Sequence, residues 1–128
     1  MKKIITNVPG GVKTSAPYSH GVIGGPQFLF VSGQGPWNPE TGKFDRGSIA
    51  EQTRLTLESV KRIVEAAGCR MENAVSCRVY LQPLNAETFA EMNAVYATYW
   101  GAEKPARTTV GATLLKFDVE IDCVVALE

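Results

Sequence analysis

A single arginine opens a run of residues that otherwise looks like a buried strand. Arg107 begins "RTTVGATLL", residues 107–115, in which Thr, Val, Ala and Leu predominate. A guanidinium in apolar surroundings needs either water or an anion, because burying an unpaired charge is costly. Its planar fork suits a carboxylate, which it can bind through two hydrogen bonds. Arg107 is therefore the first candidate for a ligand-binding residue.

Two acidic residues, Glu120 and Asp122, lie on the last predicted strand. We predict strands at 106–115 and 118–127, joined by a two-residue turn as a hairpin that pairs position 107 with position 126. Arg107 and Glu120 then share one face of the sheet, about 20 Å apart, because a strand rises about 3.3 Å per residue. They could act together only across a subunit interface. The alternative is that each charge lies at a solvated sheet edge and has no role.

An amphipathic helix of about five turns precedes these strands. Ser48 is the expected N-cap, with Glu51 three residues on as a capping box, and Gly68 is expected to end the helix. Its apolar face is Ile49, Thr53, Leu57, Val60, Ile63 and Val64.

The other elements follow from residue periodicity. Strands are expected at 20–24 and 27–33, around a Gly-Gly-Pro turn, and at 73–82, where odd and even positions face opposite sides. A loop is expected at 37–47 and a second helix at 85–101. The order β-β-α-β-α-β-β predicts an α+β architecture, a mixed sheet with two helices on one face. Its other face, carrying mostly Thr, Val and Ala of the last strands, could pack against copies of the chain.

Composition narrows the class of protein. The 128 residues, expected to form a single domain, include 13 basic and 13 acidic side chains with no basic stripe, so no nucleic-acid partner is expected. Cys69, Cys77 and Cys123 form no CxxC pair, and one histidine is present, which disfavours a disulfide framework and a metal site. The cysteines are expected to be packing residues. Without a signal peptide or a long apolar run, we expect a cytoplasmic protein that does not enter the membrane.

Several segments, in the same order, resemble the RidA/YjgF family of reactive intermediate deaminases. They are "APYSHG", "FVSGQGPWNPETG", "QTRLTLESVKRIVEAAG", "FAEMNAVYATYW", "PARTTVG" and "VEID". The resemblance implies a chorismate-mutase-like homotrimer with sites in the clefts between subunits. It also implies cofactor-free hydrolysis of enamines and imines, such as 2-aminoacrylate, to 2-keto acids and ammonia.

The resemblance also implies roles for individual residues. Arg107 would hold the substrate carboxylate, and Glu120 would direct the attacking water as a general base. The stretch before "VEID" is about two residues shorter than in relatives, so Asp122 is the alternative to Glu120. The residues implied to line the site are Tyr18, Ser32, Gly33, Asn93 and Thr109. Thr109 stands where many relatives have a cysteine, so thiol chemistry at that position is excluded.

Other interpretations of the same residues stay open. The chain could bind small carboxylates without converting them, as a regulatory trimer. A ribonuclease is a further alternative, which the zero net charge disfavours. A deaminase with a narrower substrate is also possible. His20, the one histidine, is interpreted as a loop or core residue.

Overall fold

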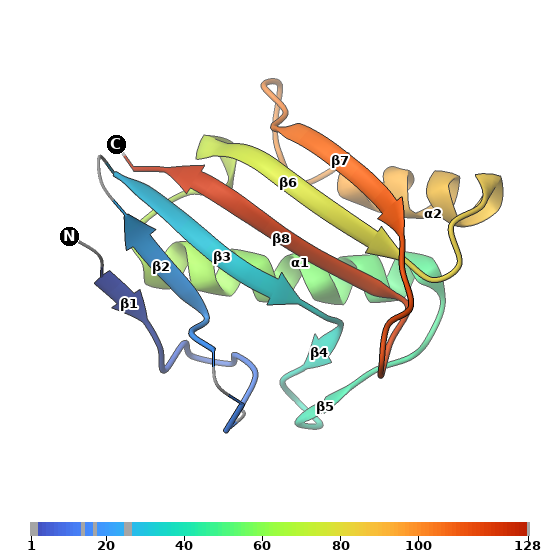
Figure 1. Cartoon of the computed structure of the whole chain (residues 1–128), viewed down its shortest axis with the longest axis horizontal. Helices are drawn as coiled ribbons and strands as arrows, with labels where there is room; N and C mark the ends of the chain where they lie inside the picture. The colour runs from blue at the N-terminus through green and yellow to red at the C-terminus, as the bar shows by residue number, and fades with distance from the viewer. Residues whose placement is uncertain (1–2, 14, 17, 25–26, 128) are drawn as a thin grey trace.

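The computed structural model describes residues 3–13, 15–16, 18–24 and 27–127. Six strands form one mixed sheet in the order β1-β2-β3-β8-β6-β7, with two α-helices on one face, which confirms the predicted α+β class (Figure 1). The large sheet consists of β1 (Lys3–Ile5), β2 (Gly21–Gly24), β3 (Phe28–Gln34), β6 (Ala74–Leu81), β7 (Ala106–Gly111) and β8 (Val119–Ala126). The helices are α1 (Ile49–Ala66), the 3-10 turn η1 (Met71–Asn73) and α2 (Ala86–Tyr96).

Three short strands are additional to the predicted elements. β1 pairs with β2 at the edge of the sheet. The expected loop 37–47 contains a small hairpin of β4 (Trp37–Asn38) and β5 (Lys43–Phe44). The predicted Gly-Gly-Pro turn includes Gly25 and Pro26, which lie outside the described residues.

The first helix matches its prediction. The Ser48 side chain accepts a hydrogen bond from the Glu51 N–H at 3.1 Å. The Glu51 carboxylate, however, pairs with Arg54 at 2.6 Å, so no reciprocal capping box is formed. Gly68 ends the helix in the left-handed region, at φ +79°.

The second helix is shorter than predicted. It begins with a capping box between Asn85 and Thr88, and it ends at Tyr96 and not near Gly101. Turns follow because the Thr98 hydroxyl and amide both bond to the carbonyl of Val95. These turns bring the following aromatic residues back into the core.

The predicted hairpin of the last two strands is wrong. β7 pairs in parallel with β6 alone, while β8 lies between β3 and β6 and is antiparallel to both. Residues 112–118 form a loop, because Gln82 binds it: its side-chain oxygen accepts from the Leu114 N–H at 2.8 Å. Arg107 therefore pairs with Cys77 on the helix side, and Glu120 pairs with Tyr80 on the other side. The prediction that Arg107 and Glu120 share a face is wrong as well.

A β-bulge changes the predicted alternation of β6. The register with β8 shifts between Ala74 and Ser76, so Ala74 is buried and Val75 is 42% exposed. The extra residue of a bulge reverses which face the residues before it occupy. From Cys77 onward the predicted alternation holds, with the odd positions buried.

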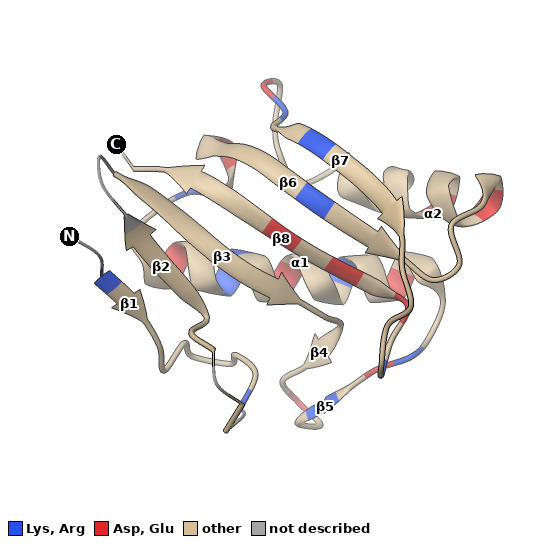
Figure 2. Cartoon of the chain, viewed as in Figure 1, with Lys and Arg blue, Asp and Glu red and all other residues tan. Residues whose placement is uncertain are grey.

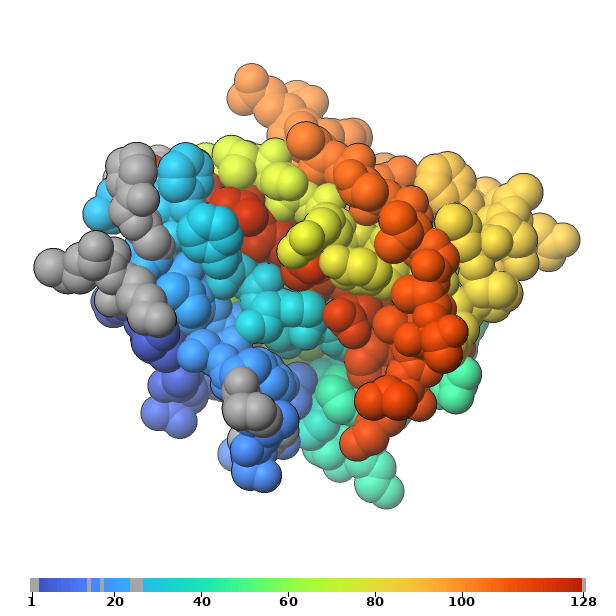
Figure 3. All heavy atoms as spheres, viewed as in Figure 1, coloured from blue at the N-terminus to red at the C-terminus, as the bar shows by residue number. Residues whose placement is uncertain are grey.

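The face of the sheet away from the helices is open. Figure 1 shows both helices behind the sheet, and Figure 3 shows the atoms of the open face from the same side. Its charged residues are Arg78 of β6 and Glu120 and Asp122 of β8, whereas β2 and β3 carry none (Figure 2). One register row crosses this face from β1 to β7 and is almost wholly apolar: Ile4, Val22, Phe30, Val124, Ser76 and Ala106. Phe30 is 49% exposed, more apolar surface than the small Thr, Val and Ala expected there.

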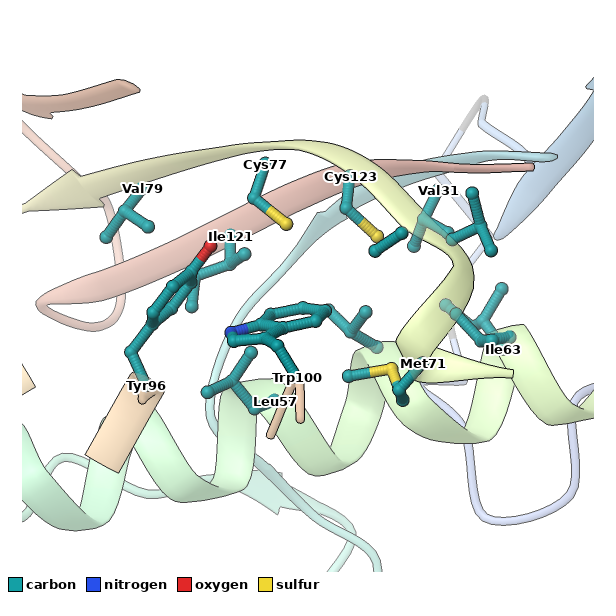
Figure 4. Packing of buried hydrophobic residues seen from close by; sticks show 14 of the residues in the cluster. Val31, Leu57, Ile63, Met71, Cys77, Val79, Tyr96, Trp100, Ile121 and Cys123 are labelled. Carbon is teal, nitrogen blue, oxygen red and sulfur yellow. The ribbon is translucent and has the colours of Figure 1, made fainter. Parts of the chain in front are cut away.

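The core fills the space between the sheet and α1 (Figure 4). The Trp100 ring packs there at 5.1 Å from the Tyr96 ring, centroid to centroid. All three cysteines are buried, as expected of small packing residues. Among the helices the structure describes, none is long and apolar enough to span a membrane.

Candidate functional site

The predicted binding arginine packs against the side chains of α2. The Arg107 guanidinium carbon is 4.7 Å from the centre of the Tyr96 ring and 5.4 Å from that of Phe89. One terminal nitrogen donates to the Asn93 side-chain oxygen at 2.6 Å and contacts the Met92 sulfur at 3.8 Å. Aromatic faces attract a cation without neutralising it. The predicted pair of Arg107 and Asn93 is thus in direct contact.

This guanidinium has no anionic partner within the described chain. The ion pairs formed between described residues are Arg46–Asp118, Arg54–Glu51 and Arg78–Asp122. Arg107 uses only one of its nitrogens in the bonds above, and a guanidinium has five N–H donors. Most of its fork is therefore available to a ligand carboxylate.

Thr109 adds a hydroxyl on the same side of β7. It lies two residues after Arg107 and pairs in register with Val79, whose side chain is buried on the helix side. The Thr109 hydroxyl oxygen is buried and has no hydrogen-bond partner among the described residues. Buried polar groups are normally paired, so this hydroxyl is suited to a ligand. We call Phe89, Asn93, Tyr96, Arg107 and Thr109 the arginine pocket.

The predicted carboxylate lies in a different place, on the open face of the sheet. Glu120 packs against Gly33 so closely that a Cβ on that glycine would lie 2.4 Å from a Glu120 carboxylate oxygen. The register of β3 with β8 shifts between Val31 and Gln34, around Ser32 and Gly33. This irregularity and the missing side chain together make room for the carboxylate. We call Ser32, Gly33 and Glu120 the carboxylate pocket.

The environment of Glu120 differs from that of Asp122. Burial, and then the charge of Asp122, raise the pKa of the Glu120 carboxyl above its ordinary value. Asp122 accepts hydrogen bonds from Arg78 at 3.0 Å and from the Tyr80 hydroxyl at 3.1 Å. Glu120 has no hydrogen-bond or ion-pair partner within the described chain. Of the two acids that the sequence leaves open, Asp122 is thus hydrogen-bonded and Glu120 is the one without a partner among the described residues.

The segment before β2 is held against the carboxylate pocket. The Ser32 N–H donates to the His20 carbonyl at 2.9 Å, and the Ser32 hydroxyl donates to the Ser19 carbonyl. Ser32 thus uses its hydroxyl within the chain. The His20 ring bonds to the Val12 carbonyl at 2.9 Å, in agreement with the predicted loop role.

Tyr18 belongs to the same segment before β2. Its ring lies 6.2 Å from the His20 ring, and it lines a surface cavity with the loop 6–13. Burial raises the pKa of the Tyr18 hydroxyl above its ordinary value. Tyr18 is half exposed, and none of the hydrogen bonds to the arginine pocket involves it.

The structure therefore arranges the predicted residues in two groups on opposite sides of the sheet. Arg107, Asn93 and Thr109 lie together on the helix side, and Gly33, next to Ser32, meets Glu120 on the open side. Tyr18 lies apart from both groups, beside His20 and the loop 6–13. The two aromatic contacts of Arg107 are missing from the predicted site. Phe89 and Tyr96 flank Asn93 at helical spacing, which was the available signal. No group of three or more metal-ligating side chains gathers in the described part.

Comparison with known proteins identifies the family. The family model Endoribonuclease L-PSP matches residues 10–127, so the chain belongs to this family, and the predicted RidA/YjgF membership is confirmed. A RutC family protein of Pyrococcus horikoshii is 44% identical over 124 residues, which is 95% of this chain and 94% of that protein.

Two Escherichia coli relatives carry functional descriptions. The 2-iminobutanoate/2-iminopropanoate deaminase is 38% identical over 119 residues, covering 91% of this chain and 88% of that protein. The crystal structure of TdcF with bound serine superposes with a TM-score of 0.85 at 28% identity, over 98% of this chain and 100% of that chain. The family thus includes an imine deaminase and a protein that binds a small amino acid.

Proposed function

We propose that this chain hydrolyses small 2-imino acids and their enamine forms, of the 2-aminoacrylate type, to 2-keto acids and ammonia. The observation that carries the proposal is the state of Arg107, whose positive charge is held by aromatic rings and an amide without an anion. Such a guanidinium favours a ligand with a carboxylate. The deaminase among the relatives supports the imine as the reacting group.

In the proposed reaction, Arg107 binds the substrate carboxylate and Glu120 activates a water. The water oxygen bonds to the imine carbon while Glu120 takes one of its protons. Glu120 then returns this proton to the nitrogen, which gives a carbinolamine. It next passes the remaining hydroxyl proton to the nitrogen as the C–N bond breaks, so that ammonia leaves and the C=O of the 2-keto acid forms. A raised pKa makes the Glu120 carboxylate a stronger base, which favours the first proton transfer. The reaction needs no redox cofactor, because no electrons are exchanged.

We propose that the complete site forms between subunits of a homotrimer. Within one chain the sheet separates Arg107 from Glu120. A neighbouring copy is the simplest source of the missing half, because its sequence supplies both groups. The open face carries Phe30, and the loop after β7 carries Leu115, which is 95% exposed. Apolar side chains of this kind are typical of surfaces that another chain covers.

A second candidate function uses the same pocket without catalysis. The serine bound to TdcF favours a protein that senses small carboxylates. Under that alternative, replacing Glu120 by Gln would leave ligand binding intact, and neither wild type nor the variant would convert the ligand. Under the proposed function, the same replacement abolishes turnover and retains binding.

The proposed function can be tested with imines made in situ. An amino-acid oxidase would generate them from several amino acids, and semicarbazide would trap the fraction that is not hydrolysed. Wild type should suppress trapping, whereas Arg107→Ala and Glu120→Gln should not. Arg54→Ala is the matched control, since this arginine is already paired with Glu51 on the surface of α1. No suppression by wild type with any imine would overturn the proposal.

A further inference from the structure

Two of the three cysteines face each other inside the sheet. Cys77 of β6 and Cys123 of β8 are directly opposite in the antiparallel register, and they are 1% and 2% exposed. Figure 4 shows both side chains below the same face of the sheet. Residues directly opposite in such a ladder have Cα atoms about 4.5–5.5 Å apart, within the range that a disulfide spans. The two thiols can therefore be joined with little movement of the strands.

The two thiols differ in acidity. The pKa of Cys77 is lowered, first because the Cys123 thiol hydrogen-bonds to it, then by the Tyr96 hydroxyl, and least by the positive charge of Arg107. Arg107 pairs with Cys77 from the other side, on β7. The pKa of Cys123 is raised, first by its hydrogen bond with Cys77 and then by burial. An acidic thiol beside a second thiol is the arrangement found where a nucleophilic cysteine has a resolving partner.

We propose that Cys77 and Cys123 are a redox modification site, which hydrogen peroxide converts to an intrachain disulfide. The Cys77 thiolate attacks one peroxide oxygen, the O–O bond breaks, and the products are a sulfenic acid and, after protonation, water. The Cys123 sulfur then displaces the sulfenic oxygen as a second water and forms the S–S bond. In total two thiols lose two electrons and two protons to one peroxide, which yields two waters.

The burial of the two sulfurs limits which oxidants can reach them. Because both sulfurs are shielded, bulky or charged thiol reagents are excluded, whereas hydrogen peroxide is small and uncharged. β7 covers Cys77 on one side and is the edge strand of the sheet, with no buried residue. Edge elements with few buried contacts open locally at low cost, which gives peroxide a path to the pair.

Counting the thiols tests the proposal and is independent of any enzyme activity. Reduced protein would be treated with hydrogen peroxide, quenched with catalase, unfolded and alkylated with N-ethylmaleimide. The number of alkylated cysteines should fall from three to one. Before alkylation, the intact mass should be lower by about 2 Da, the two hydrogens lost. Peptide mapping should join Cys77 to Cys123, and dithiothreitol should restore all three thiols.

The third cysteine supplies the matched control. Cys69 is also buried, but it lies after α1, where its thiol contacts the Ala67 carbonyl. Cys69→Ala should still form the disulfide, whereas Cys77→Ala and Cys123→Ala should not. If one of these variants fails to fold, peptide mapping of the wild-type protein still tests the proposal. Three alkylated cysteines after peroxide, a bond to Cys69, or a bond between chains would each overturn the proposal.

Discussion

Charged residues on the two sides of the sheet have different surroundings. On the helix side, α2 surrounds Arg107 with two aromatic rings and an amide. On the open side, Glu120 lies against Gly33 in an irregular stretch of β3. The cation is thus stabilised by neutral partners. The carboxylate is crowded and half-buried, and its pKa is raised by burial.

This difference shows how a fold can prevent two opposite charges of one chain from forming an ion pair with each other. Had they shared one face within reach of each other, an ion pair would occupy the fork of Arg107 and lower the pKa of Glu120. The parallel pairing of β7 with β6 prevents this by turning Arg107 toward α2. Each chain therefore presents an unneutralised cation and an unneutralised carboxylate at separate places.

The largest effect is expected from the helix side. Arg107→Lys keeps the charge but loses the fork and the stacking, so kcat/KM for imine hydrolysis should fall about 100-fold or more. Steady-state kinetics of the trapped-imine assay measure this loss. Arg54→Lys should leave kcat/KM unchanged. Equal rates for wild type and Arg107→Lys would mean that the guanidinium geometry is not used.

Mixing two inactive variants tests whether the two sides meet between chains. Arg107→Ala and Glu120→Gln would be unfolded together, refolded in equal amounts and assayed. If each site takes one group from each of two neighbours, about a quarter of the sites in a random ring are intact, and activity should return to about that fraction. Each variant refolded alone is the control. No recovery, despite mixed oligomers by native mass spectrometry, would contradict a shared site.

A smaller effect is expected from the glycine on the open side. Gly33→Ala places a Cβ 2.4 Å from the Glu120 carboxylate unless one of them moves. We expect about a tenfold loss of kcat and a destabilisation of about 1–3 kcal/mol, the usual range for overpacking. Gly47→Ala is the matched control, because its Cβ would lie 3.9 Å from the nearest atom. Urea unfolding and kinetics on both variants decide whether Gly33 is needed for space.

The smallest effect concerns stability and pH. Because the pKa of Glu120 is higher in the folded chain, the native state binds this proton more tightly than the unfolded state does. The stability that the Glu120 carboxyl contributes is therefore lost as the pH rises. The loss begins near its pKa in the unfolded chain, about 4.3, and is complete above its pKa in the folded chain. Glu120→Gln should gain stability relative to wild type between pH 4 and pH 8 in urea unfolding. The exposed Glu40→Gln should show no such trend.

Local signals in the sequence were enough for the helices and for most strands. Ser48 and Gly68 mark the ends of α1 through contacts within a few residues. The pairing of the last strands was not predictable in this way. It depends on Gln82, whose side chain binds the loop 112–118 from more than 30 residues away. Nothing near residue 112 signals that contact.

Prediction of the candidate site from the sequence was limited in the same way. Except for Phe89 and Tyr96, the residues of the arginine and carboxylate pockets were identified from motifs in the chain. Their relation in space was not, because the face on which Arg107 lies depends on which strand β7 pairs with. A rule of simple alternation also fails to predict the bulge in β6. Val75 has the apolar side chain of a core residue, yet it is exposed.

The position of β8 has a consequence for how the chain reaches its native state during synthesis. β8 follows every other strand in the sequence, yet it occupies the middle of the sheet, between β3 and β6. Until it has left the ribosome, β3 and β6 each present an unpaired apolar edge, which invites contact with other nascent chains. Pairing of β8 with both strands then closes the sheet. The interval before that pairing is when these two edges are most open to aggregation.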